Sequence, residues 1–328
     1  MKSKKNICIK FLILVVIAIS IFSFTGAAAN DAYPTANRTI EIVVPYAAGG
    51  GTDVLTRVIM KYIDIGAPVV ATNIEGASSG IGTMEVYHAP ADGYKLLCNG
   101  PESMLAFNIS GSMATPAWKD LIPLSAVVSD PNVIVVHPSS PYKTFDDFVE
   151  DAKKRPGEIS YGAVGTGGVN HLNSAQIWDA VGIKVNYVPF DSAAKSRAAI
   201  MGGHIDMALM QISEASAVVK SGDLRAILVT TKERSDYLPD IETIAELGFE
   251  EAVFAQHRAF WAPPETPAEI VKKWEEEFKR ISENSEFVNE IQNTFFLTID
   301  YLDSESVQKT LLDLKPSFEY IIENYVKK

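Results

Sequence analysis

The sequence predicts an α/β protein whose two lobes enclose a ligand cleft, and three observations support this prediction. Short β-branched runs alternate with segments of helical period, as in parallel sheets covered by helices. Two glycine-rich loops, at residues 49–51 and 162–168, each stand between a strand and a helix, about 115 residues apart. Without its first 29 residues the chain has 299, which suits two domains better than one core.

The first 29 residues are interpreted as a secretory signal peptide. Its start is basic, and residues 11–24 form a mostly apolar run of 14 residues, shorter than the ~20 that a spanning helix needs. Small residues at 27–29 suit a cleavage site near Ala29. Because no cysteine lies there, a lipid anchor is not indicated. We therefore expect an exported, periplasmic protein. Cys8 leaves with the signal, so Cys98 alone remains and no internal disulfide is expected.

The charge of the mature chain excludes some partners. Loss of the four signal lysines leaves 25 basic against 41 acidic residues, a net charge of about −16. Nucleic acid is therefore not expected as a partner, since its phosphates would be repelled. An anion site would have to use local backbone dipoles rather than long-range attraction. No histidine pair has the i, i+4 spacing of a zinc helix, so no metal and no cofactor are expected.

The first glycine loop is the most informative stretch. Residues 40–44 are β-branched and read as a buried strand, which Pro45 should end because it cannot donate to a sheet ladder. The glycines at 49–51 let the backbone approach a ligand closely. Thr52 or Asp53 can N-cap the following helix. A glycine loop at a helix start is an anion site, because free N–H groups point outward at the positive end of the helix.

The spacing of this loop does not identify the anion. A dinucleotide fingerprint counted from Gly49 would need glycine where Val54 stands, and no lysine follows the glycines as a phosphate-binding P-loop requires. A tight turn that binds nothing also remains open from the loop alone.

A different function is suggested by Gly76-Ala77-Ser78-Ser79-Gly80, a literal G-x-S-x-G. A secreted serine hydrolase would use Ser78 as nucleophile, with His204 or His257 following in the chain. Against it, Asn73, Ile74 and Glu75 intervene before this motif, whereas a nucleophile elbow directly follows its strand.

The next elements lead from one lobe to the other. A third strand at 94–98 ends at a loop containing Gly100 and Ser103, on the side where open α/β sheets bind ligands. Two extended runs, 124–128 and 132–137, are separated by Asp130-Pro131, and we take this region as the first crossing between lobes. Thr144 then begins a helix with a near capping box.

The second lobe repeats the strand, glycine loop and helix that begin the first lobe. A strand at 159–161 leads into the glycine loop at 162–168 and a helix from about Val169. His171 lies at that helix start, where its N–H could meet an anion or the backbone of its own loop. Later strands at 185–190, 205–210 and 224–230 place Phe190, Asp191 and Gln211 at strand ends, and 254–262 reads as the return crossing.

Several stretches resemble a known family. Val43-Val44-Pro45-Tyr46-Ala47-Ala48-Gly49-Gly50-Gly51-Thr52-Asp53, followed by Arg57, is similar to the opening signature of the tripartite tricarboxylate transporter substrate-binding proteins, the TctC or Bug family. Ala91-Asp92-Gly93-Tyr94, the loop from Tyr161 to His171, Gly202-Gly203-His204-Ile205-Asp206 and Thr266-Pro267-Ala268 extend the match in order along the mature chain. Ser78-Ser79, Lys95 and Asp191 depart from the family pattern.

The resemblance implies a periplasmic-binding-protein fold of the type II-like, flytrap kind, closing on a carboxylated small molecule without catalysis. It also implies delivery to a two-subunit membrane permease. We place the signal peptide at 1–29, lobe 1 at 30–129 plus 257–328, and lobe 2 at 130–256. The protein is expected to be a monomer. A sensory binding protein that reports its ligand to a receptor is an alternative that the sequence cannot separate from a transporter.

The expected ligand contacts come from both loops and from neighbouring strand ends. They are Pro45, Tyr46, Ala47, Ala48, Gly49, Gly50, Gly51, Thr52, Asp53, Gly100, Ser103, Gly165, Thr166, Gly167, Gly168, His171, Phe190, Asp191 and Gln211. Asp191 has two interpretations. Pointing inward, it would favour a monocarboxylate or an amino-acid-like zwitterion over citrate; otherwise it caps the helix that begins at Ser192.

Overall fold

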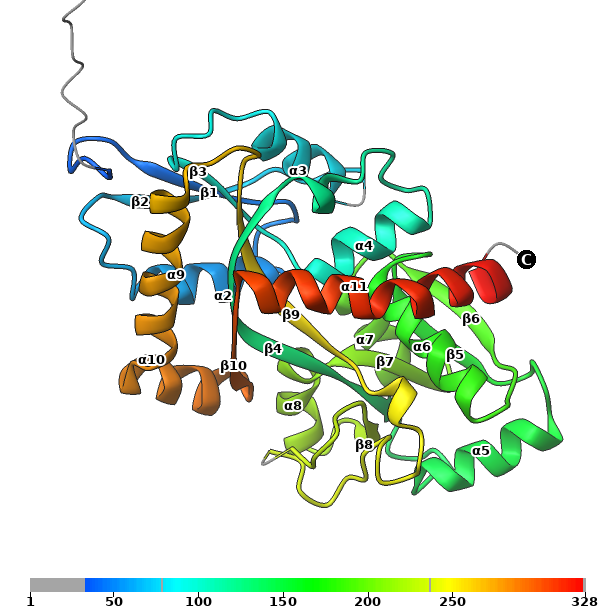
Figure 1. Cartoon of the computed structure of the whole chain (residues 1–328). Helices are drawn as coiled ribbons and strands as arrows, with labels where there is room; N and C mark the ends of the chain where they lie inside the picture. Colours follow the sequence, from blue (N-terminus) through cyan, green and yellow to red (C-terminus); the bar gives the residue numbers. More distant parts are fainter. Residues whose placement is uncertain (1–32, 78, 236, 327–328) are drawn as a thin grey trace, which may run out of the picture.

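The computed structural model describes residues 33–77, 79–235 and 237–326. The expected signal peptide and Ser78 lie outside the described residues. The chain forms a mixed ten-stranded sheet with helices packed around it, arranged as two lobes (Figure 1). In that view one lobe lies at upper left and the other, mostly green, at lower right. Over the described ranges, none of the helices combines the length and the apolar character needed to span a membrane.

The sheet of lobe 1 begins with three parallel strands and continues with antiparallel ones. The order is β2–β1–β3–β9–β4, and β10 pairs with the other side of β4. The strands are β1 (Ile40–Val44), β2 (Val69–Asn73), β3 (Lys95–Cys98), β4 (Ile122–Val136), β9 (Ala255–Ala262) and β10 (Thr298–Asp303). β1 ends before Pro45, as the sequence predicts.

The sheet of lobe 2 is built on the second half of β4. Its order is β4–β7–β5–β6, and β8 pairs with the other side of β4. The strands are β5 (Ser160–Val164), β6 (Asn186–Phe190), β7 (Met207–Gln211) and β8 (Arg225–Val229). β5 pairs in parallel with both β6 and β7, so the carboxyl ends of these three strands meet at one edge.

Two long strands join the lobes. The predicted break at Asp130-Pro131 is wrong, because β4 runs unbroken from Ile122 to Val136. Asp130 pairs with Gln256 on β9, and Pro131 pairs with Ala255. Proline restricts the preceding residue to β conformations. An X-Pro pair is therefore compatible with an extended strand as well as with a turn. β9 returns alongside β4, so both crossings are antiparallel neighbours (Figure 1).

Helices pack around both halves of the sheet. They are α2 (Gly51–Met60), α3 (Gly80–Tyr87), α4 (Pro101–Ile109), α5 (Phe145–Lys154), α6 (Val169–Ala180), α7 (Ala193–Met201), α8 (Ile212–Lys220), α9 (Ala268–Ser282), α10 (Ser285–Glu290) and α11 (Ser304–Ile321). Short 3₁₀ turns lie at Ala117–Lys119 and Glu250–Ala252, and π-helical turns at Ile291–Phe295 and Ile322–Val326. Thr144 caps α5 through the capping box that the sequence predicts.

Each lobe has its own apolar core. In lobe 1, Ile40 and Ile42 of β1 pack with α2, α9 and α10. In lobe 2, separate clusters fill the two faces of its sheet, one with α5 and α6 and the other with α7 and α8. A remaining cluster joins residues of α4, α11 and the first half of α6. Contact between the lobes is therefore partly apolar on the side of α11.

The C-terminal helix α11 spans both lobes (Figure 1). It starts beside β10 in lobe 1 and reaches α6 in lobe 2, where Gln176 Nε2 donates to Ser317 Oγ at 2.6 Å. The hydroxyl of Tyr325 in the following turn donates to Asp179. These contacts connect the two lobes along α11 and the turn that follows it.

Candidate functional site

A cavity of about 720 Å³ lies between the lobes at the carboxyl ends of the strands. Its wall includes both glycine loops, together with Ser103 and Phe107 of α4, Arg197 of α7 and Glu214 of α8. The volume falls in the range of small-molecule sites, roughly 300–1,000 Å³.

Five helices begin at this cavity. Each directly follows a strand that ends there, because β1, β3, β5, β6 and β7 precede α2, α4, α6, α7 and α8 in the chain. The first N–H groups of a helix lack intrahelical acceptors and carry partial positive charge. Over the residues that the structure describes, the starts of α2 and α6 leave such N–H groups free for a bound anion, whereas the Ser213 N–H at the start of α8 donates to Asp130 Oδ1 at 3.2 Å.

The first glycine loop is fixed by Asp53. The N–H of Gly49 donates to Asp53 Oδ2 at 2.8 Å, while Asn73 Nδ2 and Arg57 Nε donate to Oδ1 at 3.0 and 2.9 Å. Burial alone would raise the pKa of Asp53, but these donors together hold it below its ordinary value. Asp53 therefore shapes the loop from behind and does not line the cavity.

Gly50 N-caps α2 without any side-chain hydrogen bond, so the predicted capping by Thr52 or Asp53 is wrong. In the described part of the chain, no acceptor is assigned to the N–H groups of Gly51 and Thr52. Both residues line the cavity. The loop thus offers a ligand two free amides at the start of a helix.

The second glycine loop is fixed by His171. The N–H of Gly167 donates to His171 Nδ1 at 3.1 Å, and the ring stacks on Tyr187 with centroids 3.9 Å apart. Burial lowers the pKa of His171 to about 4, so the imidazole is neutral at pH 7 with its proton on Nε2. His171 thus meets the backbone of its own loop rather than the cavity.

Gly167 belongs to the contact between lobes. It has φ of +72°, and a Cβ added there would lie 2.9 Å from Ser110 Cβ of α4. The amides that the second loop turns to the cavity belong to Val169 and Asn170, for which no acceptor is assigned among the described residues.

The expected contacts divide into two groups. Those in the cavity wall are Tyr46, Ala47, Ala48, Gly49, Gly50, Gly51, Thr52, Ser103, Gly165, Gly168, Asp191 and Gln211. Those that do not line the cavity are Pro45, Asp53, Gly100, Thr166, Gly167, His171 and Phe190.

Three of the second group are closely packed against or bonded to other parts of the chain. Pro45 lies against α3, since a Cβ added at Gly82 would be 2.9 Å from Pro45 Cβ. A Cβ at Gly100 would lie 2.9 Å from the carbonyl oxygen of His257. The carbonyl of Phe190 accepts the Gly165 N–H at 3.1 Å, so this residue supports the second loop.

Asp191 lies at the rim. Its side chain is 87% exposed and pairs with Lys195 Nζ at 2.6 Å, and this pairing lowers the pKa of Asp191. The predicted capping role is wrong, because the cap of α7 is Ser192, whose hydroxyl accepts the Lys195 N–H at 3.4 Å. With Lys195 as its partner, Asp191 does not present a free charge to a ligand.

Sequence reasoning missed the side chains that give the cavity floor its charge and polarity, chiefly Arg197, Glu214 and Gln256. Arg197 lies in the second turn of α7, Glu214 in the first turn of α8, and Gln256 on the return crossing. Only Glu214 lies just after a strand end, and no glycine motif marks any of the three positions.

A chain of hydrogen bonds crosses the floor from one lobe to the other. Gln256 Nε2 donates to Ser103 Oγ, and Gln211 Nε2 donates to Gln256 Oε1, both at 2.6 Å. Arg258 Nη2 then donates to Gln211 Oε1 and to Asp130 Oδ2, each at 3.2 Å. Asp130 also accepts the Ser213 hydroxyl at 2.6 Å. The floor is thus a continuous polar connection between α4 and α8.

The charges in this floor are buried. Asp130 is fully buried, which raises its pKa, although Arg258 and Ser213 act in the opposite direction. Burial and the nearby Asp130 also raise the pKa of Glu214 to about 7, against the lowering influence of Arg258 and Arg197. Nε and Nη1 of Arg258 have no hydrogen-bond partner among the described residues.

A second buried charge cluster lies behind the cavity, in lobe 1. His257 Nδ1 contacts Glu102 Oε1 at 2.6 Å, and Nε2 contacts Asp300 Oδ2 at 3.1 Å. Burial alone would lower the pKa of His257, but the two carboxylates raise it to about 10. The imidazolium therefore ties α4 and β10 to the crossing strand β9.

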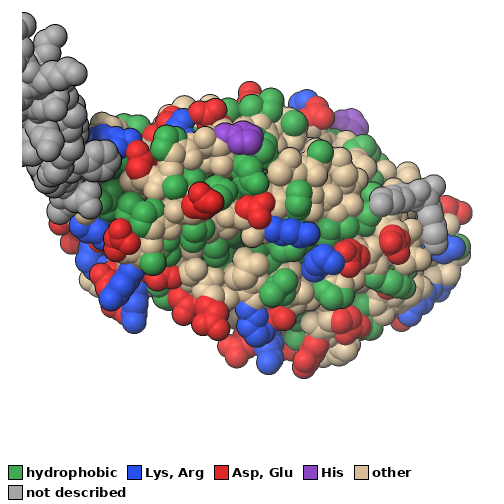
Figure 2. Space-filling view, turned by 45° about the horizontal axis from the view of Figure 1, so that its top comes forward, with side chains coloured by type: hydrophobic (Ala, Val, Ile, Leu, Met, Phe, Trp, Pro, Cys, Tyr) green, Lys and Arg blue, Asp and Glu red, His purple; other side chains and the backbone are tan. Residues whose placement is uncertain are grey.

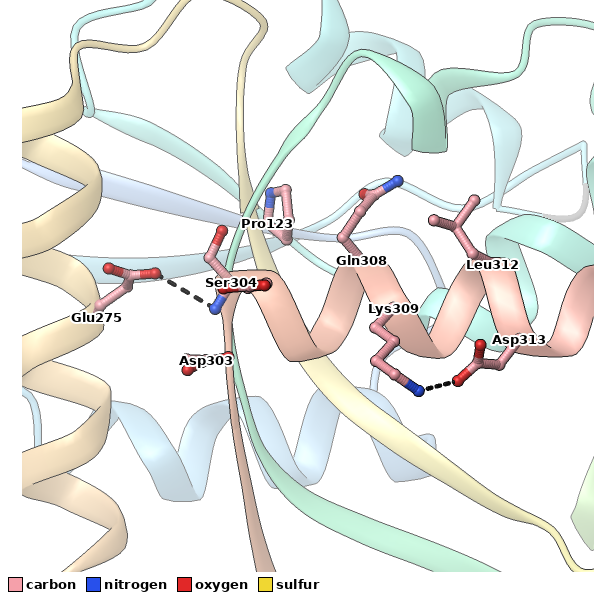
Figure 3. A pocket seen from close by; sticks show the side chains of 9 residues that line it. Pro123, Glu275, Asp303, Ser304, Gln308, Lys309, Leu312 and Asp313 are labelled. Atoms are coloured by element: carbon pink, nitrogen blue, oxygen red, sulfur yellow. Dashed lines mark hydrogen bonds and ion pairs between the residues drawn. The ribbon is translucent and has the colours of Figure 1, made fainter.

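Another hollow, of about 750 Å³, lies outside lobe 1 between α9 and α11 (Figure 3). The N–H donors at the start of α11 are already used: Asp303 Oδ1 accepts from Ser306 and Glu275 Oε1 accepts from Ser304. Most of its charged side chains are acidic, and Lys309 is paired with Asp313. We assign no anion site to it. Over the face in Figure 2, acidic and basic side chains are interspersed.

Comparison with known proteins places this geometry in context. The chain matches the family described as "Tripartite tricarboxylate transporter family receptor" (TctC) over residues 57–324. It is 32% identical to a protein from the TAR-I ttuE-ttuC' intergenic region of Agrobacterium vitis, over 77% of this chain and 73% of the relative. It is 30% identical to protein BugT of Bordetella pertussis, over 80% and 81% of the two chains.

Solved structures share the fold. A periplasmic transporter superimposes with a TM-score of 0.79 at 26% identity, covering 90% of this chain and 99% of its own. MatC of Rhodopseudomonas palustris with bound malate gives 0.74 at 22% identity, covering 87% and 99%. A second R. palustris protein, solved with adipate, gives 0.77 at 24% identity, covering 89% and 97%. The two-lobed periplasmic-binding-protein fold is thus confirmed.

Proposed function

Since the chain belongs to the tripartite tricarboxylate transporter receptor family, TctC, whose members are solute-binding proteins, we propose that it captures a small carboxylated ligand between its lobes. The ligand is then delivered to a two-subunit membrane permease. The protein acts outside the cytoplasm, as a monomer and without catalysing a reaction.

One observation carries the proposal: the first turns of five helices line one cavity. A carboxylate accepts strong hydrogen bonds from backbone N–H groups and is favoured by the positive end of a helix. The free amides of Gly51 and Thr52 from one lobe, and of Val169 and Asn170 from the other, support a clamp that closes on the ligand from both sides.

The known ligands of neighbours agree with this chemistry. Malate and adipate, found in two structures of the same fold, are both small dicarboxylates. A cavity of about 720 Å³ has room for such a molecule and several ordered waters.

The lobes are proposed with the bounds 30–129 plus 257–328 and 130–256. The two boundaries lie opposite each other, since Ser129 pairs with His257 and Asp130 with Gln256 between β4 and β9. These two strand positions would act as the hinge when the cleft opens and closes.

The hydrolase alternative is not proposed. Ser78 lies outside the described residues, and both ring nitrogens of His257 are engaged by carboxylates, so His257 is not a free base. A purified protein that hydrolyses esters, and loses this activity with Ser78→Ala, would support the enzyme instead.

The test begins with the purified mature protein. Mass spectrometry of the small molecules released on denaturation should recover a carboxylic acid, and calorimetry with that acid should give a 1:1 complex. Recovery of a neutral or cationic molecule that binds 1:1 would overturn the proposal. Pull-down on the cognate membrane fraction then separates delivery to a permease from reporting to a receptor.

A further inference from the structure

Arg197 and Glu214 face the cavity without an ion-pair partner of their own. Arg197 makes one long hydrogen bond, from Nη1 to the backbone carbonyl of Glu214 at 3.4 Å. Within the described ranges, no carboxylate lies within ion-pair distance of Arg197. Other charges near the cleft are matched, Asp191 with Lys195 and Asp130 with Arg258. The cavity therefore has one unmatched positive charge whenever Glu214 is protonated.

Glu214 approaches the first glycine loop from the opposite lobe. A Cβ added at Gly51 would lie 3.9 Å from Glu214 Oε1 and 3.6 Å from Arg258 Nη2. Its carboxyl group is therefore beside the free amides at the start of α2. A ligand carboxylate bound to those amides would lie next to the carboxyl group of Glu214.

Two carboxyl groups in contact do not both ionise, because like charges at this distance repel strongly. A protonated Glu214 can instead donate its O–H to the ligand carboxylate, which is a short and strong type of hydrogen bond. The ionised form would cancel the positive potential that the helix ends create.

We propose that the cleft binds a dicarboxylate, with one carboxylate at the start of α2 beside a protonated Glu214 and the other on Arg197. This inference rests on the proposed function, since it assumes that the cleft binds a carboxylate. Arg197 suits the second carboxylate because its planar guanidinium can donate two parallel hydrogen bonds. Arg197 and Glu214 then determine specificity, and binding takes up a proton.

The charged groups around Glu214 make proton uptake measurable near neutral pH. They are Asp130 on β4, Arg258 on β9 and Arg197 on α7, whereas the residues by which α2 lines the cavity (Gly51, Thr52, Val54 and Leu55) carry no charge. Together with burial, they place the pKa of Glu214 at about 7 in the free protein. A ligand carboxylate beside it would raise this pKa further. Binding should therefore weaken as pH rises through 7, towards about tenfold per pH unit.

The experiment is calorimetry of the mature protein with three ligand types of equal length: succinate, glutarate and adipate, their monocarboxylates, and the ω-amino acids. Titrations in HEPES and in Tris at pH 7 and 8 give the number of protons taken up. The ligand carboxylates are ionised throughout, since their pKa values lie near 4–5. We expect one dicarboxylate to bind at least about tenfold tighter than its monocarboxylate, with uptake approaching one proton at pH 8.

Three variants assign this behaviour to residues. Glu214→Gln, which resembles the protonated carboxyl group, should keep dicarboxylate binding but lose both proton uptake and pH dependence. Arg197→Gln should reduce dicarboxylate affinity to that of the monocarboxylate. Lys153→Gln on α5 removes the same unit of charge at an exposed position distant from the cavity wall. It should change neither the dicarboxylate affinity nor the proton uptake. Matching far-UV circular dichroism and melting temperatures confirm that the variants fold.

The outcomes are distinguishable. Dicarboxylate binding without proton uptake, unaffected by Glu214→Gln, overturns this inference and leaves the proposed function intact. If an ω-amino acid binds tightest and Glu214→Gln abolishes that binding, Glu214 binds an ammonium group. This result also overturns the inference. If none of these acids binds and the ligand released from the protein has no carboxylate, both proposals fall.

Discussion

The two glycine loops use the same construction with different chemistry. In each, the third residue of the following helix accepts the N–H of the residue four positions earlier: Asp53 accepts from Gly49, and His171 from Gly167. Asp53 is an ionised carboxylate with two further donors, Asn73 and Arg57. His171 is a neutral imidazole stacked on an aromatic ring.

The difference shows that a glycine loop at a helix start can serve either as a ligand contact or as a contact between the lobes. The first loop leaves its amides free at the cavity and keeps the charge of its supporting side chain behind the wall. In the second loop, Gly167 packs against Ser110 at the C-terminal end of α4 in the other lobe. Part of this loop therefore forms a contact between the lobes. Glycine content alone therefore does not distinguish a ligand contact from an interlobe contact.

Acid titration should affect the support of the second loop most. The folded pKa of His171, about 4, lies below its ordinary value of 6.5, so its contribution is fully present above pH 6.5 and is lost as pH falls towards 4. The loss amounts to about 2–3 kcal/mol. Urea unfolding of wild type and His171→Gln at pH 7 and 4.5 should show a steeper acid loss for wild type.

His204→Gln is the control for that experiment, because His204 is exposed on the surface. It should show the same pH dependence as wild type. Equal acid losses in wild type and His171→Gln would contradict the buried, neutral state assigned to His171.

Valine substitutions should separate the roles of the two loops. Gly51→Val places a side chain in the cavity at a helix start that accepts it, with atoms of Arg258, Gln211 and Glu214 at 3.6 to 3.9 Å. We expect carboxylate affinity to fall about 30–100-fold, the equivalent of one or two charged hydrogen bonds, with little change in melting temperature.

Gly167→Val should behave in the opposite way. Its φ of +72° and its 2.9 Å approach to Ser110 predict a lower unfolding free energy, by about 1–3 kcal/mol, and weaker binding only as a consequence. Differential scanning calorimetry with and without ligand measures both quantities. Normal stability with abolished binding in Gly167→Val would place this glycine at the ligand after all.

Asp53→Asn tests the support of the first loop. It removes the ion pair with Arg57 and disturbs the acceptor of the Gly49 N–H, so a loss of about 1–2 kcal/mol in unfolding free energy is expected. Chemical denaturation at pH 7 measures it. Because Asp53 lies behind the cavity wall, no ligand contact is lost directly. An unchanged stability together with a large loss of affinity would instead assign Asp53 a direct contact.

The smallest effect is expected at Asp191, where the chain departs from its family's pattern. Its charge is exposed and matched by Lys195, and exposed ion pairs contribute little. Asp191→Gly should leave the melting temperature and the ranking of mono- and dicarboxylates unchanged. A reversal of that ranking would restore the selective role considered from the sequence.

Much of the architecture was predictable because it depends on local signals. The strand ending before Pro45, the glycine loops and the capping box of Thr144 follow from the residues that occupy them. The unbroken strand through Asp130 and Pro131 was not predictable, because it depends on pairing with β9, over 100 residues away in the chain. Tertiary pairing there outweighs the local preference for a turn.

The candidate site was predictable to a similar degree. The sequence indicated which loops reach the cleft, but Asp53 and His171 turned out to support those loops from behind. Arg197, Glu214 and Gln256 belong to no motif, and their importance arises only when α7, α8 and β9 meet at one cavity. Residues that come together only in the folded protein cannot be identified from local sequence patterns.

Comparing a carboxylate with its neutral amide tests the central claim most directly. Calorimetry would use the acid released from the protein and the derivative in which each carboxylate is a carboxamide of the same shape. If convergent helix N-termini capture the ligand, the acid should bind at least about 100-fold tighter, since charge-assisted hydrogen bonds are roughly twice as strong as neutral ones. Equal affinity for the acid and its amide would contradict the anion site.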